Sequence, residues 1–410
     1  METQRQIGAR CRVLTMDGGP SPLLQIRLLA EIERRYPGFL ERTDVFAGTS
    51  DGSLITLFLA AQLTRKKKAP QIFEEAIGFA NGIVHALDAT WCGLARLVLG
   101  YAAMDRGERF RKLLSAPENF GDLYMTDLDR RAMVVTFDAF SWEPRYFRNF
   151  SPFCERRVHE DPRGPKLVSA ALASSAFPMF LPIHYGPGKR HFVDGGLVAN
   201  NPAMCALVSA AEHLRALSGD KTDSIRPWLD RVCLFSLGAT ESEAERHATT
   251  RPPKTNERDE GNEKQRAIDH GAVRPDESNA PRRDMRHSKE RMKISRWPDR
   301  DIDWGWMQWL AVRPMFLINT MLQASSNAVT QQCNDLLGPQ HHRYGPSMGE
   351  IAAALGIMLA PPGKVISELD KRANEIIHGK HYDGLVFAEA LRWVESFWMK
   401  DHPDQTTVSP

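Results

Sequence analysis

Residues 45–63 read Val-Phe-Ala-Gly-Thr-Ser-Asp-Gly-Ser-Leu-Ile-Thr-Leu-Phe-Leu-Ala-Ala-Gln-Leu. The apolar run 45–47 has the length of a short buried strand, and it leads directly into a G-x-S-x-G pattern at 48–52. From 54 to 63 the chain is apolar at nearly every position, which predicts a helix buried on all sides. The stretch therefore predicts a strand, a tight turn that carries Ser50, and a buried helix. This is the arrangement of a nucleophile elbow.

The G-x-S-x-G pattern is weak evidence when taken alone. With 29 glycines in 410 residues, chance produces it in roughly one chain in ten. Its glycines suit a sharp turn because they leave room beside Ser50, and the positive end of the following helix would favour an oxyanion there. The alternative is a tight turn whose serine merely caps the helix.

Two further turns share the sequence Asp-Gly-Gly, at residues 17–19 and 194–196, and each follows a short apolar run. Successive glycines can direct backbone N–H groups into one cavity, which an oxyanion hole requires. An aspartate at the end of one strand can also reach a serine at the end of a neighbouring strand. Each motif by itself is equally compatible with a plain turn in which the aspartate bonds its own backbone.

Apolar runs that predict strands alternate with segments of helical spacing. The later predicted strands are 132–137, 191–193 and 232–237, and a helical pattern over 23–32 ends at Pro37 and Gly38. Strands that alternate with helices indicate an α/β sheet covered by helices on both faces.

The segment 241–300 differs sharply from its surroundings. Of its 60 positions, 28 are Lys, Arg, Asp or Glu, and six are large apolar residues. Such a segment cannot bury enough apolar surface to offset its ordering entropy, so we interpret it as a disordered or loosely ordered insertion. It separates a core at 11–240 from a helical part at 301–400, which we assign to the same domain.

The overall composition excludes several classes of protein. The chain has 53 basic and 51 acidic residues, a net charge of +2, which gives no reason to expect a nucleic-acid partner. Its six cysteines form no C-x-x-C pair, which favours reduced thiols in the cytoplasm. No signal peptide and no apolar run of about 18 residues is apparent, so any membrane contact is expected to be peripheral. No phosphate, zinc or calcium motif is present, so no cofactor and no metal are predicted.

In their order and spacing, the three glycine turns resemble the motifs of the patatin-like phospholipase family. The small-residue stretch 168–178, ending in proline, is similar to a helix of that family, and 192–202 is similar to its base loop. The resemblance extends from about residue 11 to 238 and is weaker over 304–344. It implies a three-layer fold, with a mostly parallel central sheet flanked by helices and a helical C-terminal part.

The resemblance also implies a serine–aspartate dyad that acts on fatty-acyl esters of phospholipids or related lipids, at a membrane surface. Ser50 would be the nucleophile and Asp194 the general base, and no histidine is required. The backbone N–H groups of Gly18 and Gly19 would form the oxyanion hole. The residues that would support these motifs are Asp17, Gly48, Gly52, Gly195 and Gly196.

One departure from the family pattern affects the oxyanion hole. The family's first turn continues with a third glycine and a basic residue, whereas this chain continues with Pro20, Ser21 and Pro22. Proline has no N–H, so Pro20 cannot donate to an oxyanion. Loss of one donor lowers the rate on the order of a hundredfold. The N–H groups of Ser21 or Asp51 are candidates to assist.

Two other functions remain open on the sequence. The first is a patatin-fold protein that binds lipid or a partner but catalyses poorly, which Pro20 would explain. The second is an α/β-hydrolase esterase with a Ser–Asp–His triad, for which His213 is the candidate; His191 is expected to be structural. The segment after the charged insertion is either an apolar lid or membrane face, or part of the core; its apolar residues are Trp304, Trp306, Trp309, Leu310, Met315, Phe316, Leu317 and Ile318.

Overall fold

The computed structural model describes residues 4–87, 107–150, 163–222, 224–238, 314–346 and 360–400. The chain divides into two compact units, one formed by Met1–Thr240 with Met315–Pro410 and the other by Glu241–Pro314. All described residues except Pro314 belong to the first unit. The charged segment predicted at 241–300 and the tryptophans at 304–309 lie outside the described residues.

The described strands form one sheet with the order β5-β6-β3-β2-β1-β7-β8, and β4 pairs with β3 off this path. Strands β3, β2, β1, β7 and β8 are parallel, whereas β4, β5 and β6 join antiparallel at one side. This confirms the predicted α/β class with a mostly parallel sheet. The strands are β1 (Cys11–Met16), β2 (Val45–Thr49), β3 (Arg131–Asp138), β4 (Glu143–Arg148), β5 (His184–Gly186), β6 (Arg190–Asp194), β7 (Val232–Leu237) and β8 (His341–Tyr344).

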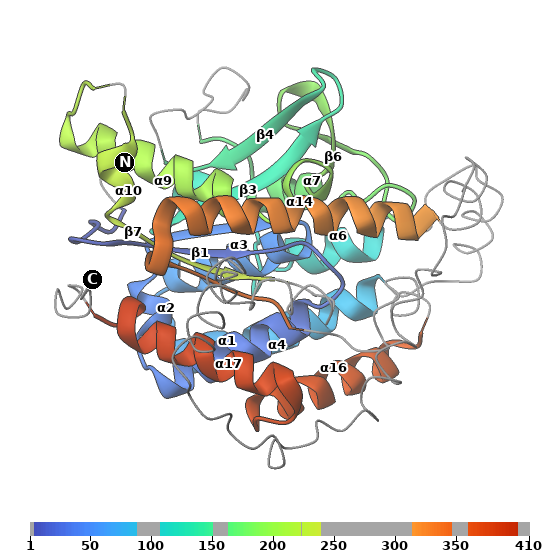
Figure 1. Ribbon diagram of the computed structural model, residues 1–410. Helices are drawn as coiled ribbons and strands as arrows, with labels where there is room; N and C mark the ends of the chain where they lie inside the picture. The colour runs from blue at the N-terminus through green and yellow to red at the C-terminus, as the bar shows by residue number, and fades with distance from the viewer. Residues whose placement is uncertain are drawn as a thin grey trace, which may run out of the picture. The chain divides into compact units, whose positions relative to one another are not determined.

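Helices cover both faces of the sheet (Figure 1). One face carries α1, α3, α4, α16 and α17, and the other carries α9 and the C-terminal part of α14. The described helices are α1 (Pro22–Arg35), α2 (Phe39–Arg42), α3 (Asp51–Thr64), α4 (Ala69–Ala86), α6 (Glu108–Ser115), α7 (Leu167–Ser174), α8 (Gly196–Ala199), α9 (Ala203–Ser218), α10 (Arg226–Leu229), α14 (Pro314–Leu337), α16 (Pro362–Ile377) and α17 (His381–Trp393).

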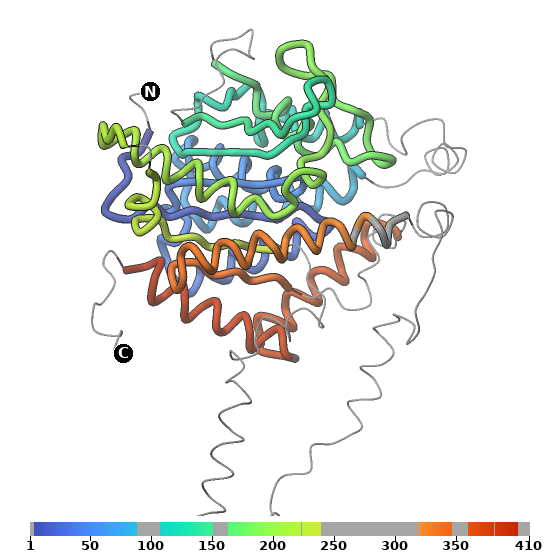
Figure 2. The backbone as a smooth tube through the Cα atoms, turned by 45° about the horizontal axis from the view of Figure 1, so that its top comes forward, coloured from blue at the N-terminus to red at the C-terminus, as the bar shows by residue number. Residues whose placement is uncertain are grey.

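The alternation of side chains along β1 explains the two apolar layers. Because successive strand residues point to opposite faces, Leu14 and Met16 join the core beneath α1 and α3, whereas Cys11 and Val13 pack against α9. Helix α3 is buried along nearly its whole length, as its continuous apolar sequence predicts. The path of the chain through the three layers can be followed in Figure 2.

Strands β4, β5 and β8 were not predicted from the sequence. Strand β5 has three residues and β8 has four, and neither shows a long alternating pattern. The part predicted as helical, residues 301–400, contains α14, α16, α17 and a π-helical segment at Val394–Trp398, but it also contains strand β8, which was not predicted. Within the described ranges, no helix combines the length and the apolar character needed to cross a bilayer.

Candidate active site

The turn between β2 and α3 has the backbone of a strained elbow. Ser50 adopts φ 50° and ψ −127°, a conformation that a residue with a side chain rarely takes. A Cβ atom on Gly48 would lie 2.5 Å from the carbonyl oxygen of Gly52, and one on Gly52 would lie 2.3 Å from that of Met16. Both positions therefore require glycine, because the backbone passes too close for any side chain.

Strand register explains why Ser50 meets Asp194. Strand β2 pairs with β3 only as far as Thr49 opposite Val135, and β6 pairs with β3 from the next residue, with Asp194 opposite Thr136. Strand β4 pairs with the opposite edge of β3. Strand β6 therefore pairs with the same edge of β3 as β2 does, beyond the point where β2 ends. The last residue of β6 and the first residue after β2 consequently meet end to end.

The two side chains are in direct contact. Ser50 Oγ donates a hydrogen bond of 2.6 Å to Asp194 Oδ2, while the Gly196 N–H donates one of 2.6 Å to Asp194 Oδ1. Asp194 is almost fully buried. Burial raises the pKa of this carboxyl group to about 7, although the hydrogen bonds from Ser50 and Gly196 oppose that shift. The group can therefore accept and release a proton near neutral pH.

Helix α7 holds the backbone on both sides of the dyad through Ser174. The Ser50 N–H donates to Ser174 Oγ at 3.0 Å, and Ser174 Oγ donates to the carbonyl of Val135 at 2.7 Å. The carbonyl of Ser174 accepts the Gly195 N–H at 3.0 Å. Ser174 belongs to the small-residue stretch 168–178, but its hydrogen-bond partners lie far away along the chain, so the local sequence gives no sign of this role.

The first glycine turn lies against Ser50. A Cβ atom on Gly18 would lie 2.9 Å from Ser50 Cβ. The Gly18 N–H, however, donates to the carbonyl of Asn200 at 3.2 Å, and the Ser21 N–H donates to the carbonyl of Gly19 at 2.8 Å. Neither N–H is open to a substrate in this arrangement. In the described part of the chain, Gly19 and Asp51 are the expected donors whose N–H groups make no hydrogen bond.

Asp17 is held by a residue from the far end of the sheet. Both Arg343 guanidinium NH groups reach its carboxylate, at 2.8 and 3.1 Å, and both side chains are buried. Arg343 also donates to Ser236 Oγ at 3.1 Å. The family's basic residue is missing from the first turn, but a cation from β8 stands beside that turn. Sequence analysis missed it, because nothing in the local pattern at 341–344 links it to Asp17.

A second acidic group lies at the start of α3. Asp51 is partly exposed, and desolvation, reinforced by the nearby charge of Asp194, raises its pKa to about 7. It follows the nucleophile directly in the chain. Two carboxyl groups near Ser50 therefore titrate in the same pH range.

The histidines considered for a triad lie elsewhere. His213 Nε2 accepts a hydrogen bond of 2.8 Å from Arg131 Nε, and its ring packs edge-on against Phe150. His191 is exposed on β6, with its ring 5.2 Å from that of Tyr185. The direct contact between Ser50 and Asp194 leaves no space for an imidazole between them. The triad arrangement is therefore wrong for this chain.

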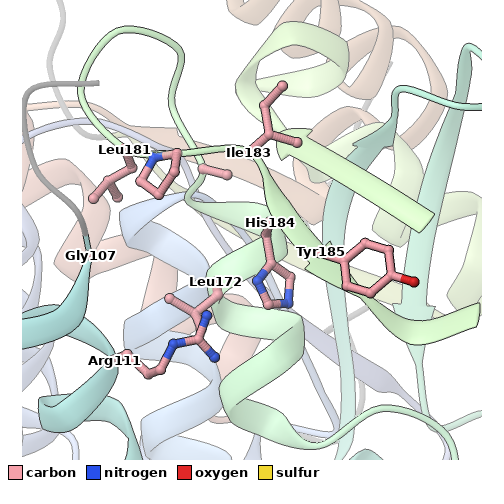
Figure 3. A pocket seen from close by; sticks show the side chains of 9 residues that line it. Gly107, Arg111, Leu172, Leu181, Ile183, His184 and Tyr185 are labelled. Atoms are coloured by element: carbon pink, nitrogen blue, oxygen red, sulfur yellow. The ribbon is translucent and has the colours of Figure 1, made fainter. Parts of the chain in front are cut away.

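A cavity of about 220 Å³ lies between α6, α7 and β5. Figure 3 shows the Arg111 and His184 side chains approaching each other beside Leu172. His184 Nε2 is 2.8 Å from Ser169 Oγ, and burial, together with the charge of Arg111, lowers the pKa of His184 to about 4. The cavity adjoins Asp194, because the carbonyl of Ala176 in its wall accepts the Asp194 N–H at 3.1 Å.

Comparison with known proteins finds one family model and several relatives that match part of this chain. Residues 14–207 match the family model described as patatin-like phospholipase. A cGAMP-activated phospholipase of Escherichia coli (strain TW11681) is 28% identical over 220 residues, which cover 50% of this chain and 58% of that protein. Patatin-like protein 2 of Oryza sativa subsp. indica is 27% identical over 241 residues, covering 52% of this chain and 55% of that protein.

A second cGAMP-activated phospholipase, from Vibrio cholerae serotype O1, is 30% identical over 211 residues, covering 48% of this chain and 56% of that protein. The chain thus spans somewhat more than half the length of each of these three relatives. Among solved structures, VipD from Legionella pneumophila aligns with a TM-score of 0.32 at 10% identity, covering 96% of this chain and 81% of that one.

Proposed function

Because residues 14–207 of this chain belong to the patatin-like phospholipase family, we propose that the chain hydrolyses fatty-acyl esters of phospholipids or related lipids. Ser50 forms the acyl-enzyme and Asp194 is the general base. The observation that carries this proposal is the hydrogen bond of 2.6 Å between Ser50 Oγ and Asp194 Oδ2. A nucleophile in contact with a buried base is the minimal arrangement for acyl transfer.

The reaction proceeds in two steps. In the first, Ser50 Oγ attacks the ester carbonyl carbon while its proton passes to Asp194 Oδ2, and the alcohol leaves with that proton. In the second, a water molecule gives a proton to Asp194 as its oxygen attacks the acyl carbon. The fatty acid then leaves and Ser50 regains its proton. The hydrogen bond from Gly196 keeps Oδ1 in place, so that Oδ2 stays directed at Ser50.

The oxyanion is stabilised by the N–H groups of Gly19 and Asp51, which are the expected donors without an internal partner. The N-terminus of α3 adds its partial positive charge. The Gly18 N–H contributes only when its hydrogen bond to the carbonyl of Asn200 opens. Because fewer backbone N–H donors face the oxyanion than the family pattern provides, we expect hydrolysis to be slow. A lipid-binding protein that catalyses poorly therefore remains the second candidate.

The test is fatty-acid release from mixed phospholipid vesicles and from a soluble short-chain ester. Ser50→Ala and Asp194→Ala should each lower release by at least about a thousandfold, because each removes a group that acts in the transition state. Ser175→Ala is the matched control, since its hydroxyl bonds only the carbonyl of Ala171. It should behave like the parent protein.

The two candidate functions predict different results. A parent chain that releases no fatty acid from either substrate would contradict the hydrolase and favour the lipid-binding protein. Release that persists in both Ser50→Ala and Asp194→Ala would show that the dyad is not the reacting pair.

A further inference from the structure

The turn between β3 and β4 exposes two large aromatic side chains. Phe140 is 75% exposed and Trp142 is 79% exposed, the highest values among the described large apolar residues. Exposed single apolar residues are common on protein surfaces, but two bulky rings in one short turn need a reason. Neither ring is required by the core.

This turn is well ordered, so the exposure is not the result of a loose loop. Asp138 Oδ1 accepts the N–H groups of Phe140 and Ser141 at 2.9 and 3.3 Å, and the carbonyl of Asp138 accepts the Trp142 N–H at 2.9 Å. The Trp142 ring also packs edge-on against Phe137, with ring centres 6.1 Å apart. The fold therefore holds both rings outward in a fixed conformation.

Strand register places the turn beyond the active site. Strand β3 runs parallel to β2 and pairs with its last residue, Thr49, through Val135. Strand β3 continues for three more residues, to Asp138, and residues 139–142 follow on the carboxyl side of the sheet, where Ser50 also emerges. Leu197, three residues after Asp194, is 53% exposed. The exposed apolar side chains thus lie along the same edge of the sheet as the dyad.

Strand β5 extends the apolar surface next to this turn. Ile183 and Tyr185 are 57% and 59% exposed. Both residues also line the cavity beside His184 (Figure 3). Strand β5 pairs with β6, which pairs with the end of β3. These residues and the β3–β4 turn therefore belong to one continuous part of the sheet.

Cationic side chains border the two rings. Arg190 lies over the Phe140 ring, 5.7 Å from its centre, and bonds Asp138 at 2.6 Å. Arg145 also faces Asp138, and Lys189 is exposed beside Arg190. Residues 138–145 and 189–190 together carry three basic side chains and two acidic ones, Asp138 and Glu143. Exposed aromatic rings next to basic side chains suit the interface of a bilayer that contains anionic lipids, because the rings enter the headgroup region and the basic groups attract the lipid charges.

We propose that the β3–β4 turn, with Phe140 and Trp142 at its tip, is the surface by which this chain docks on a lipid bilayer. Tyr185 and Ile183 on the β5 side extend the surface, and Lys189 and Arg190 contact anionic headgroups. The inference rests on the proposed lipid hydrolysis and gives that reaction a location, because docking here presents the edge of the sheet that carries Ser50 to the membrane.

The test measures binding separately from catalysis. Full-length protein carrying Ser50→Ala is sedimented with phosphatidylcholine vesicles, with or without phosphatidylglycerol. We expect binding to both kinds of vesicle and stronger binding to the anionic ones. Adding Phe140→Ala and Trp142→Ala should lower the partition coefficient at least about tenfold, because two rings lose their apolar contact with lipid.

Two variants test whether the location and the chemistry matter. Leu217→Ala with Leu385→Ala removes two side chains that are 60% and 64% exposed, on α9 and α17; binding should stay within about twofold of the parent. Phe140→Trp with Trp142→Phe keeps both rings and should retain binding. In the chain with Ser50 intact, Phe140→Ala with Trp142→Ala should lower hydrolysis of vesicle lipid but not of a soluble ester.

Absence of binding to either kind of vesicle would overturn the docking surface, as would equal binding by the parent and the double alanine variant. Equal loss in the Leu217→Ala, Leu385→Ala control would also overturn it. If the parent hydrolyses neither substrate, the proposed reaction fails, yet the vesicle experiment still decides the docking surface because it uses an inactive chain throughout.

Discussion

At the scale of single residues, we expect the buried carboxyl group of Asp194, the proposed base, to control how the rate of hydrolysis depends on pH. The base must be deprotonated to act, and burial raises its pKa to about 7. We therefore expect kcat/KM for a soluble ester to fall about tenfold for each pH unit below that value and to level off above it. A profile measured from about pH 5 to about pH 9 checks this. A rate that stays flat down to the acidic limit would contradict it.

Asp51 needs a separate control, because its pKa is also raised to about 7. Asp51→Asn should leave the acidic fall in rate in place, since Asp194 remains the base. If the fall disappears in this variant, the observed titration belongs to Asp51.

Arg343 is expected to matter for catalysis through Asp17. Arg343→Gln leaves the buried carboxylate of Asp17 without its bidentate partner, which costs about 3–5 kcal/mol when a buried pair is broken. We expect kcat to fall about ten- to a hundredfold with little change in KM, because the turn that carries Gly19 loses its anchor. Arg343→Lys should recover part of the loss. Thermal unfolding and steady-state kinetics measure both effects.

Arg372→Gln is the comparison for this prediction. Arg372 pairs with the buried Asp383 in the C-terminal helices, away from the glycine turns. The Arg372→Gln variant should have a lower melting temperature than the parent but a similar kcat. If the two arginine variants lower kcat equally, Arg343 acts only through stability.

At the scale of elements, the junction between β2 and α3 depends on close backbone approach. Gly52→Ala would place a Cβ atom 2.3 Å from the carbonyl oxygen of Met16, so β1 and α3 would have to separate. We expect a loss of about 1–3 kcal/mol in the free energy of unfolding, together with loss of activity. Gly78→Ala within α4 is the control, because nothing lies within 4 Å of its Cβ position. That variant should be neutral or more stable by about 0.5–1 kcal/mol, as measured by denaturant unfolding.

Elements also differ in how well they can be predicted. Strand β7 was predicted with its observed bounds, and β2, β3 and α3 within a few residues, because each has a pronounced apolar pattern bounded by turn residues. Strand β5 has three residues, and β8 reads His-His-Arg-Tyr, which has no apolar run. Such strands form because a neighbouring strand offers free hydrogen-bonding groups, and this condition is not encoded locally.

At the scale of the whole molecule, the C-terminal residues complete the core beneath the first strands. The Trp398 ring stacks on Phe39 with centres 4.8 Å apart, and the Trp398 carbonyl accepts a hydrogen bond of 2.6 Å from Arg12 Nε. Trp398→Ala should lower the free energy of unfolding by about 3–5 kcal/mol. Leu385→Ala, which removes an exposed side chain, should change it by less than about 0.5 kcal/mol. Denaturant unfolding of both variants tests whether the C-terminal part belongs to the same domain.

The chain sequence predicted the α/β class and the elbow at Ser50, and its resemblance to the patatin-like phospholipase family implied Asp194 as the partner of Ser50. Each of these depends on local patterns: short apolar runs, glycines at tight turns, and motifs in a fixed order. The direct contact between Ser50 and Asp194, by contrast, arises because β2 and β6 end against the same edge of β3. No pattern within either strand specifies that register.

Only the tertiary structure decided which groups surround the dyad. Ser174 bonds Ser50 across 124 positions, and Arg343 reaches Asp17 across 326. The tertiary structure also showed that the Gly18 N–H donates a hydrogen bond to the carbonyl of Asn200. The sequence had suggested this N–H as a donor to the oxyanion. The physical reason is the same in each case. A hydrogen bond between residues far apart in the chain depends on how the strands are ordered in the sheet, and local sequence carries no record of that order.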